Sequence, residues 1–163
     1  MRERIMRRRM RGVAAVEFGI LLIPLVMLAF GITEFGRAIY SYNTMAKSVR
    51  DAARYLTSKA PGDPLERDTA ACMAVYGLPV PECIDWPDPP PIPPLVTGLT
   101  PAMVQTCDAI SPCIGVQSVI LTGTGTINTV TVRITGYPYN SFVEYVMPDI
   151  IFGNIAVTMR SQL

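Results

Sequence analysis

The feature that most constrains this chain is a run of apolar residues near its N-terminus, directly after a cluster of arginines. From Val13 to Thr33 the sequence holds a single charged residue, Glu17. About twenty apolar residues are enough for an α-helix to cross the hydrocarbon core of a bilayer. The first eleven residues contain six arginines against one acidic residue, Glu3. Because basic residues that flank a span stay in the cytoplasm, the pattern predicts a single-pass membrane protein whose N-terminus is cytoplasmic.

The apolar run continues into a second helical pattern, which argues against an ordinary secretory signal. A signal peptide would end in a small-residue cleavage site of the A-x-A type, and none follows the run. Instead, apolar residues recur at spacings of three and four, which predicts one helix from Val13 to about Ser58. The stripe that we expect to face a soluble domain consists of Ile39, Tyr42, Met45, Val49, Ala53 and Leu56.

The charge and composition of the rest of the chain exclude several function classes. Beyond the arginine cluster the chain has eight basic and twelve acidic residues, so no basic surface for nucleic acid is expected. The sequence contains no histidine, which removes the commonest general base and the commonest metal ligand. No combination of nucleophile, base and acid stands out. We therefore expect no enzyme, no catalytic residues, no metal site and no cofactor.

Four cysteines lie downstream of the apolar run: Cys72, Cys83, Cys107 and Cys113. An even number, confined to the part expected outside the cytoplasm, predicts two disulfides in an oxidising compartment. Three pairings are possible. The shorter loops favour the local pairs, 72 with 83 and 107 with 113. Metal binding is the competing interpretation, and the spacing and the missing histidine argue against it.

The segment after the long helix predicts a short helix and a proline-dense loop. Asp63-Pro64-Leu65-Glu66 combines an acidic N-cap, proline at the first helical position and a capping-box glutamate. We expect this helix to end at Gly77. Residues 79–101 then predict an extended loop because nine prolines fall in them. A surface connection is favoured over a binding site for a proline-recognising ligand.

The C-terminal part predicts a small antiparallel sheet. Residues 116–122 and 129–135 are expected as strands joined by the turn at 122–126, residues 141–151 as a short helix, and residues 155–160 as a further strand. The predicted fold is α+β: a long N-terminal helix, with a membrane half and an amphipathic half, packed on this sheet. The expected domains are a basic cytoplasmic leader (1–12), a transmembrane helix (13–36) and an extracytoplasmic domain (37–163).

Glu17 is the single charged residue of the apolar run, and a helix that only anchors the chain in a membrane does not require it. A carboxylate in an apolar span costs about 2.5–3.5 kcal/mol unless it is paired or protonated. One interpretation is a first-turn acid that favours the helix dipole and reaches the headgroups. The other is a charge that seeks a partner: if the chain is cut after Gly12, the new α-amine at Val13 of a neighbouring subunit could pair with Glu17. Glu34 is expected only to end the apolar run and to pair with Arg37 three residues on.

These residues closely resemble the TadE-like family of tight-adherence (Flp) pilus assembly proteins, a group of minor pseudopilins. The resemblance is strong over residues 11–58 and looser elsewhere. It is carried by the basic leader, the Gly12 junction, Glu17-Phe18, the Leu/Ile/Pro run, Ile-Thr-Glu-Phe-Gly-Arg at 32–37 and Ala-Ala-Arg-Tyr-Leu at 52–56. It implies a pilin-like outer domain, and a bacterial inner-membrane protein whose C-terminal domain lies in the periplasm or in a surface pilus.

The resemblance also implies a function and partners. A prepilin peptidase would cut between Gly12 and Val13, and Glu17, followed by Phe18, would become the fifth residue of the mature chain, the position that type IV pilins use for subunit recruitment. The implied role is a structural minor pilin or pseudopilin of a type IVb-like pilus. Its partners would be the peptidase, other pilin subunits, inner-membrane assembly proteins and membrane lipid. The alternative is an uncleaved adhesive or ligand-binding module, suggested by the proline-rich loop and by Tyr137 and Tyr139, which are expected to be exposed.

Overall fold

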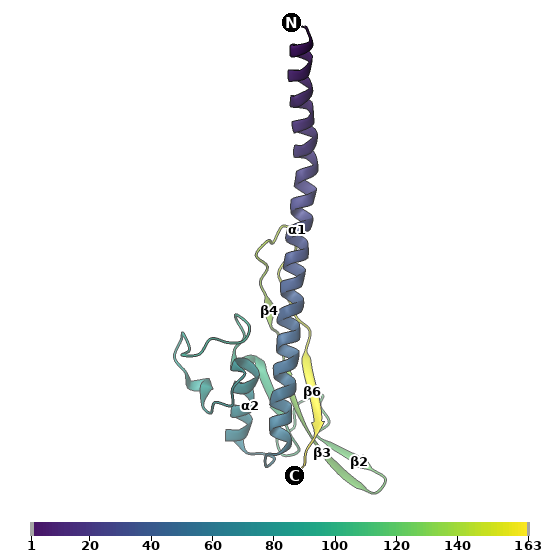
Figure 1. The fold of residues 1–163 in the computed structure, drawn as a ribbon. Coiled ribbons are helices and arrows are strands. Elements are labelled where there is room, and N and C mark those ends of the chain that lie inside the picture. Colours follow the sequence, from purple (N-terminus) through teal and green to yellow (C-terminus); the bar gives the residue numbers. More distant parts are fainter. Residues whose placement is uncertain (1, 163) are drawn as a thin grey trace. The chain divides into compact units, whose positions relative to one another are not determined.

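The structure is a computed structural model that describes residues 2–162, with side chains from residue 13 onward. The side chains of the predicted leader, residues 1–12, lie outside this part. The α+β class predicted from the sequence is confirmed: a long helix, a shorter helix and antiparallel strands make up the fold (Figure 1). The chain divides into two compact units, one formed by Met1–Ala38 with Asn140–Asp149, the other by Ile39–Tyr139 with Ile150–Leu163.

Helix α1 runs from Arg2 to Thr57 without interruption and contains Pro24 in its interior. The prediction of one continuous helix from Val13 to about Ser58 is confirmed, and the observed helix begins earlier. Its apolar part is long enough to cross a membrane, and none of that part is buried inside the structure. The helix therefore leaves the surface that is expected to face lipid uncovered.

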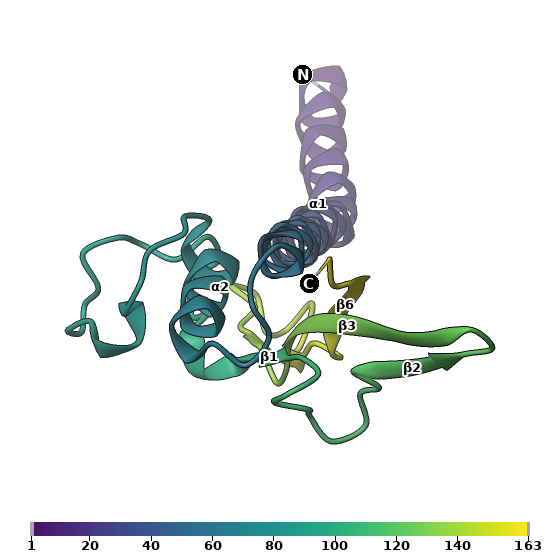
Figure 2. The same ribbon diagram turned by 90° about the horizontal axis from the view of Figure 1, so that it is seen from below.

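The second half of α1 buries four of the six residues of the predicted stripe, Ala53 and Leu56 among them. Met45 and Val49 are fully buried, as expected, but Ile39 and Tyr42 are each 47% exposed. The prediction was wrong for those two residues. The buried face is completed by small side chains, Ser41, Ser48 and Ala52. Small residues let a helix approach its neighbours closely, and Figure 2 shows this half of α1 lying over the sheet beside α2.

Helix α2 (Pro64–Tyr76) has the boundaries that its sequence predicts. The Asp63 side chain accepts a hydrogen bond of 3.0 Å from the Leu65 N–H, and proline occupies the first turn. Gly77 ends the helix with φ 76°, a left-handed conformation that glycine adopts without steric cost. Its N–H donates to the Met73 carbonyl at 2.9 Å.

The central strand of the sheet is β3 (Gly125–Ile134). Strands β1 (Val104–Cys107) and β6 (Ile155–Arg160) pair with its C-terminal half, both antiparallel. Strand β2 (Val119–Thr122) pairs with its N-terminal half and forms the predicted hairpin. The strands at 155–160 and within 116–122 and 129–135 are confirmed, whereas β1 was not predicted.

Strand β3 is covered on both faces over its C-terminal half. Val130, Val132 and Ile134 are buried, as their alternation predicts. The threonines on the opposite face are buried too: Thr129 donates to the Gln117 carbonyl at 2.9 Å, and the Thr131 hydroxyl lies 2.7 Å from that of Thr158. The strand is therefore a central one, and the expectation of a half-buried strand was wrong here.

The predicted helix at residues 141–151 is absent. Within this stretch the chain forms a turn, in which the N–H groups of Val146 and Met147 both donate to the Val143 carbonyl. Residues Ile150–Ile151 form β5, which pairs with β4 (Pro138–Tyr139). Proline at 148 lacks an N–H and disfavours helical backbone before it, which explains why a helix does not continue through the segment.

Both expected disulfides are formed in the local pairing. Cys72 of α2 bonds to Cys83 in the proline-dense segment, and Cys107 at the end of β1 bonds to Cys113. The proline-dense segment is irregular, with two short 3-10 turns, η1 (Cys83–Asp85) and η2 (Pro101–Met103). The disulfides therefore fasten two irregular connections to regular elements.

Tyr137 and Tyr139 are buried, contrary to expectation, at 4% and 1% exposed. Their rings pack on Phe152, with centroid distances of 5.6 and 5.4 Å. The Tyr137 hydroxyl donates to the Thr97 carbonyl at 2.8 Å. These tyrosines belong to the core, and neither offers a surface to a ligand.

Candidate functional site

The predicted assembly residues lie on an open helix surface. Every residue from Val13 to Phe30 is exposed on α1, including Glu17, and Phe18 is 66% exposed. Among the described residues, none forms a hydrogen bond or ion pair with the Glu17 carboxylate. This part of the chain is thus an apolar cylinder with a single charge on it.

The predicted cleavage junction lies one helical turn before that charge. Gly12 and Val13 are both within α1, and Val13 is 59% exposed. Residues four apart lie on the same face of a helix, so Val13 and Glu17 share one face. A cut at this junction would place a new amine and the carboxylate within one turn of each other.

A second acidic residue, Glu34, has a larger role than its sequence position suggests. The predicted pair with Arg37 is confirmed, with Nε of the arginine 3.2 Å from Oε1 of Glu34. The same oxygen accepts a hydrogen bond of 3.0 Å from the Phe142 N–H, and the Arg37 guanidinium also donates to the Asn140 carbonyl. Glu34 is only 4% exposed. The pair therefore fastens the loop Asn140–Asp149, which we call the span loop, to the helix.

The span loop and the helix enclose an apolar groove of about 350 Å³. It is lined by Leu22, Ile23, Val26, Met27, Phe30, Val143, Tyr145 and Val146. All helix members of this set belong to the apolar run. Sequence reasoning missed the groove, because a loop more than a hundred residues away gives no local signal that it returns to the span.

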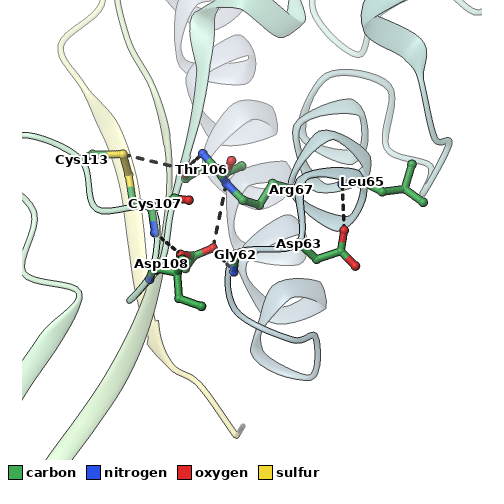
Figure 3. A network of polar contacts seen from close by, with 10 residues as sticks. Gly62, Asp63, Leu65, Arg67, Thr106, Cys107, Asp108 and Cys113 are labelled. Carbon is green, nitrogen blue, oxygen red and sulfur yellow. Dashed lines mark hydrogen bonds and ion pairs between the residues drawn. A yellow bond between two sulfur atoms is a disulfide. The ribbon is translucent and has the colours of Figure 1, made fainter.

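A polar network in the other unit organises the loops around the second disulfide (Figure 3). Asp108, which follows β1, accepts hydrogen bonds from the N–H groups of Ser111, Ile110 and Gly62 at 2.6, 2.9 and 3.0 Å. Its carboxylate also lies 4.0 Å from Nε of Arg67. Burial alone would raise the pKa of Asp108, but the three N–H groups and the arginine outweigh it, so the pKa is lowered.

A second polar link joins the end of α1 to α2. Glu66 was expected to cap its own helix, but instead it accepts a hydrogen bond from the Tyr55 hydroxyl and one of 3.0 Å from Nζ of Lys59. These hydrogen bonds, that of Tyr55 foremost, lower the pKa of Glu66. Lys59 also lies over the Tyr55 ring, 4.7 Å from its centroid. Both networks hold elements together, and neither resembles a reaction centre.

No group of three or more potential metal-ligating side chains occurs within residues 13–162. The candidate functional residues are Glu17, which is the single charge on the exposed apolar part of α1, and the pair Glu34 and Arg37, which lies at the end of that part.

The fold is α+β, and one helix among the described residues is long and apolar enough to cross a membrane, which is consistent with membrane anchoring. The family model described as TadE-like protein matches residues 12–54. The match begins at the Gly12 junction, includes Glu17 and Glu34, and follows α1 to within one turn of its end at Thr57. It confirms the resemblance over this segment and points to a part in tight-adherence pilus assembly. No curated protein and no solved structure matches the chain.

Proposed function

We propose that this protein is a structural minor pilin or pseudopilin of a tight-adherence pilus, with no catalytic role of its own. The observation that supports the proposal is the exposed Glu17, without a partner among the described residues, in the segment that matches the TadE-like proteins. In this proposal the N-terminus is cytoplasmic, because of its arginines, and the domain beyond the span is in the periplasm or the pilus.

The proposed role of Glu17 follows from the cost of an unpaired charge in lipid. A carboxylate in the span costs about 2.5–3.5 kcal/mol, and a positive partner offsets that cost. After cleavage behind Gly12 by a prepilin peptidase, the α-amine at Val13 of a neighbouring subunit would be such a partner. Helices of other pilin subunits, together with inner-membrane assembly proteins, would then cover the exposed apolar cylinder.

The test is to replace Glu17 in the native host. We expect Glu17→Gln and Glu17→Ala to lower surface pilus production and co-purification with other pilus subunits, while the amount of protein in the membrane stays unchanged. Glu82→Gln, an exposed acid of the other unit, is the matched control and should leave both readouts at the wild-type level. Unaltered assembly in both Glu17 variants would refute the proposal.

Processing is tested separately by intact mass of the protein from its host. Loss of residues 1–12 supports cleavage, and Gly12→Val should abolish that loss by placing a branched side chain at the junction. An intact N-terminus in the wild-type protein would instead support a leader that is kept as a fixed anchor.

A second candidate function is an adhesive or ligand-binding module that is not cleaved. The buried Tyr137 and Tyr139 do not support it, but the β2–β3 hairpin does, because all of β2 is exposed and Leu121 is 83% exposed. Leu121→Ser should then reduce saturable binding of the purified protein to a surface or glycan array. Equal binding by wild type and variant would count against this function.

A further inference from the structure

We propose that the span loop, Asn140–Asp149, is a second membrane-contacting element that lays its aromatic side chains into the interface of the bilayer that α1 crosses. The proposal rests on α1 as a membrane span. It depends neither on pilus assembly nor on cleavage of the leader.

The first argument is where the loop is docked. Val143, Tyr145 and Val146 line one groove together with Leu22 to Phe30 of the apolar run. Gly31 lies opposite Val146, since a Cβ atom at this glycine would be 3.4 Å from Cγ1 of the valine. These helix residues belong to the second half of the apolar run, so the loop lies beside the end of the span that is nearer to Glu34. Whatever covers this part of the helix therefore meets the loop as well.

The second argument is how the loop is fastened. Its two ends are joined by the Asp149 carboxylate, which accepts a hydrogen bond of 2.8 Å from the Ser141 N–H. Glu34 and Arg37 hold the same end of the loop through the Phe142 N–H and the Asn140 carbonyl. Charged and polar groups thus gather at the end of the apolar run, where a membrane surface would lie.

The third argument is that the loop satisfies much of its own backbone. The Val143 N–H donates to the Ser141 hydroxyl at 3.2 Å, and the N–H groups of Val146 and Met147 donate to the Val143 carbonyl at 2.9 and 3.0 Å. Irregular backbone near lipid is tolerated only where its polar groups find partners. This turn meets much of that requirement with its own atoms.

The fourth argument is the chemistry of the exposed side chains. Phe142 is 82% exposed and Tyr145 is 88% exposed. Adjacent large apolar side chains that are exposed to water commonly mark a site of contact with a membrane or a partner. Tyrosine and tryptophan are enriched where a bilayer meets water, which fits Tyr145 in particular. The Arg37 guanidinium lies over the Phe142 ring, 4.1 Å from its centroid, where it could also meet a lipid phosphate. Glu144 is exposed between Val143 and Tyr145, which favours the interface over the bilayer centre.

The experiment uses the full-length protein reconstituted in lipid vesicles, with tryptophan as the reporter. Trp86 is the single tryptophan of the chain, so Trp86→Phe gives a dark background that keeps an aromatic ring against Tyr76. Tyr145→Trp is added to this background, with Leu121→Trp as the matched control. Both replaced residues are more than four-fifths exposed, so neither substitution disturbs a core.

We expect the Tyr145→Trp emission to shift to shorter wavelength in vesicles and to fall by about half with lipids that carry bromine near the headgroup end of the acyl chain. The Leu121→Trp emission should stay at the position of a hydrated indole and remain unquenched. Phe142→Trp is a second, independent reporter and should also be quenched.

Two results would overturn the proposal. One is that both loop reporters behave like Leu121→Trp, which would place the loop in water. The other is a short-wavelength emission without bromolipid quenching, which would mean that another copy of the protein covers the groove. Neither result bears on Glu17, and pilus assembly in the host is measured separately, so failure here is distinct from failure of the proposed function.

Discussion

Glu34 accepts a hydrogen bond of 3.0 Å from the backbone N–H of Phe142, 108 residues later in the chain. The carboxylate is buried at the end of the apolar run and also pairs with Arg37, one turn on. A hydrogen bond to a charged group contributes about 1.5–3 kcal/mol, more than one between neutral groups. The position of the span loop on the helix therefore depends largely on this one acid.

Removing the Glu34 carboxylate should free the span loop without unfolding the protein. We expect Glu34→Ala to raise the hydrogen-exchange rate of residues 140–149 about ten- to a hundredfold, because the charged hydrogen bond is lost. Glu34→Gln keeps an acceptor for the Phe142 N–H and should give an intermediate rate. Glu17→Ala, which removes an acid from the same helix, should leave the loop protection unchanged. Equal exchange in wild type and Glu34→Ala would show that apolar contacts alone hold the loop.

The candidate site was only partly accessible to sequence reasoning. Glu17 could be found, because a lone charge in an apolar run is a local anomaly. The Glu34–Arg37 pair could be predicted as well, since residues three apart meet on a helix. The contact with Phe142 could not, because nothing near residue 142 indicates that its N–H will be left for a side chain. Local patterns reveal the charges of the site but not the distant backbone that satisfies them.

Asp108 should be among the most sensitive acidic residues for stability. Asp108→Ala leaves the N–H groups of Gly62, Ile110 and Ser111 without their acceptor, and each donor that stays out of reach of water costs about 1–3 kcal/mol. Since water reaches part of the site in the variant, we expect a total loss of about 3 kcal/mol in the free energy of unfolding. Urea unfolding of the full chain in detergent, followed by Trp86 fluorescence, measures it. The exposed Asp68→Ala should cost about 0.5 kcal/mol or less.

The same carboxylate predicts a loss of stability in acid. The pKa of Asp108 is lowered in the folded protein, so the unfolded chain binds the proton more readily. Its contribution is complete above the ordinary aspartate pKa of about 3.9 and is lost as the pH falls through the lower, folded value. Glu66, whose pKa is also lowered, acts in the same direction. Unfolding free energies measured from pH 6 downward should fall less steeply for Asp108→Asn than for wild type. Parallel curves would contradict the assignment.

The fold shows where local sequence patterns are sufficient. Helix α2 begins and ends where predicted because Asp63, Pro64 and Gly77 act through their own backbone neighbours. Residues 141–151 were assigned wrongly, since their apolar spacing suits a helix while Pro148 and the Asp149 side chain close a loop instead. Tyr137 was expected to be exposed, and its burial was missed because it depends on a contact with Phe152, which lies in a different segment of the chain.

The buried stripe of α1 gives the last prediction. The periodicity placed Ile39 and Met45 on one buried face, but Met45 is fully buried and Ile39 is 47% exposed. Met45→Ala should therefore leave a cavity and lower the free energy of unfolding by about 2–5 kcal/mol. Ile39→Ala shortens a side chain of similar size, but from a half-exposed position, so it should cost about 1 kcal/mol or less. The two variants are compared by urea unfolding in the same detergent, with binding of a hydrophobic dye as a check for loosened packing. Similar costs at the two positions would mean that Ile39 is packed as tightly as Met45, as the sequence pattern predicted.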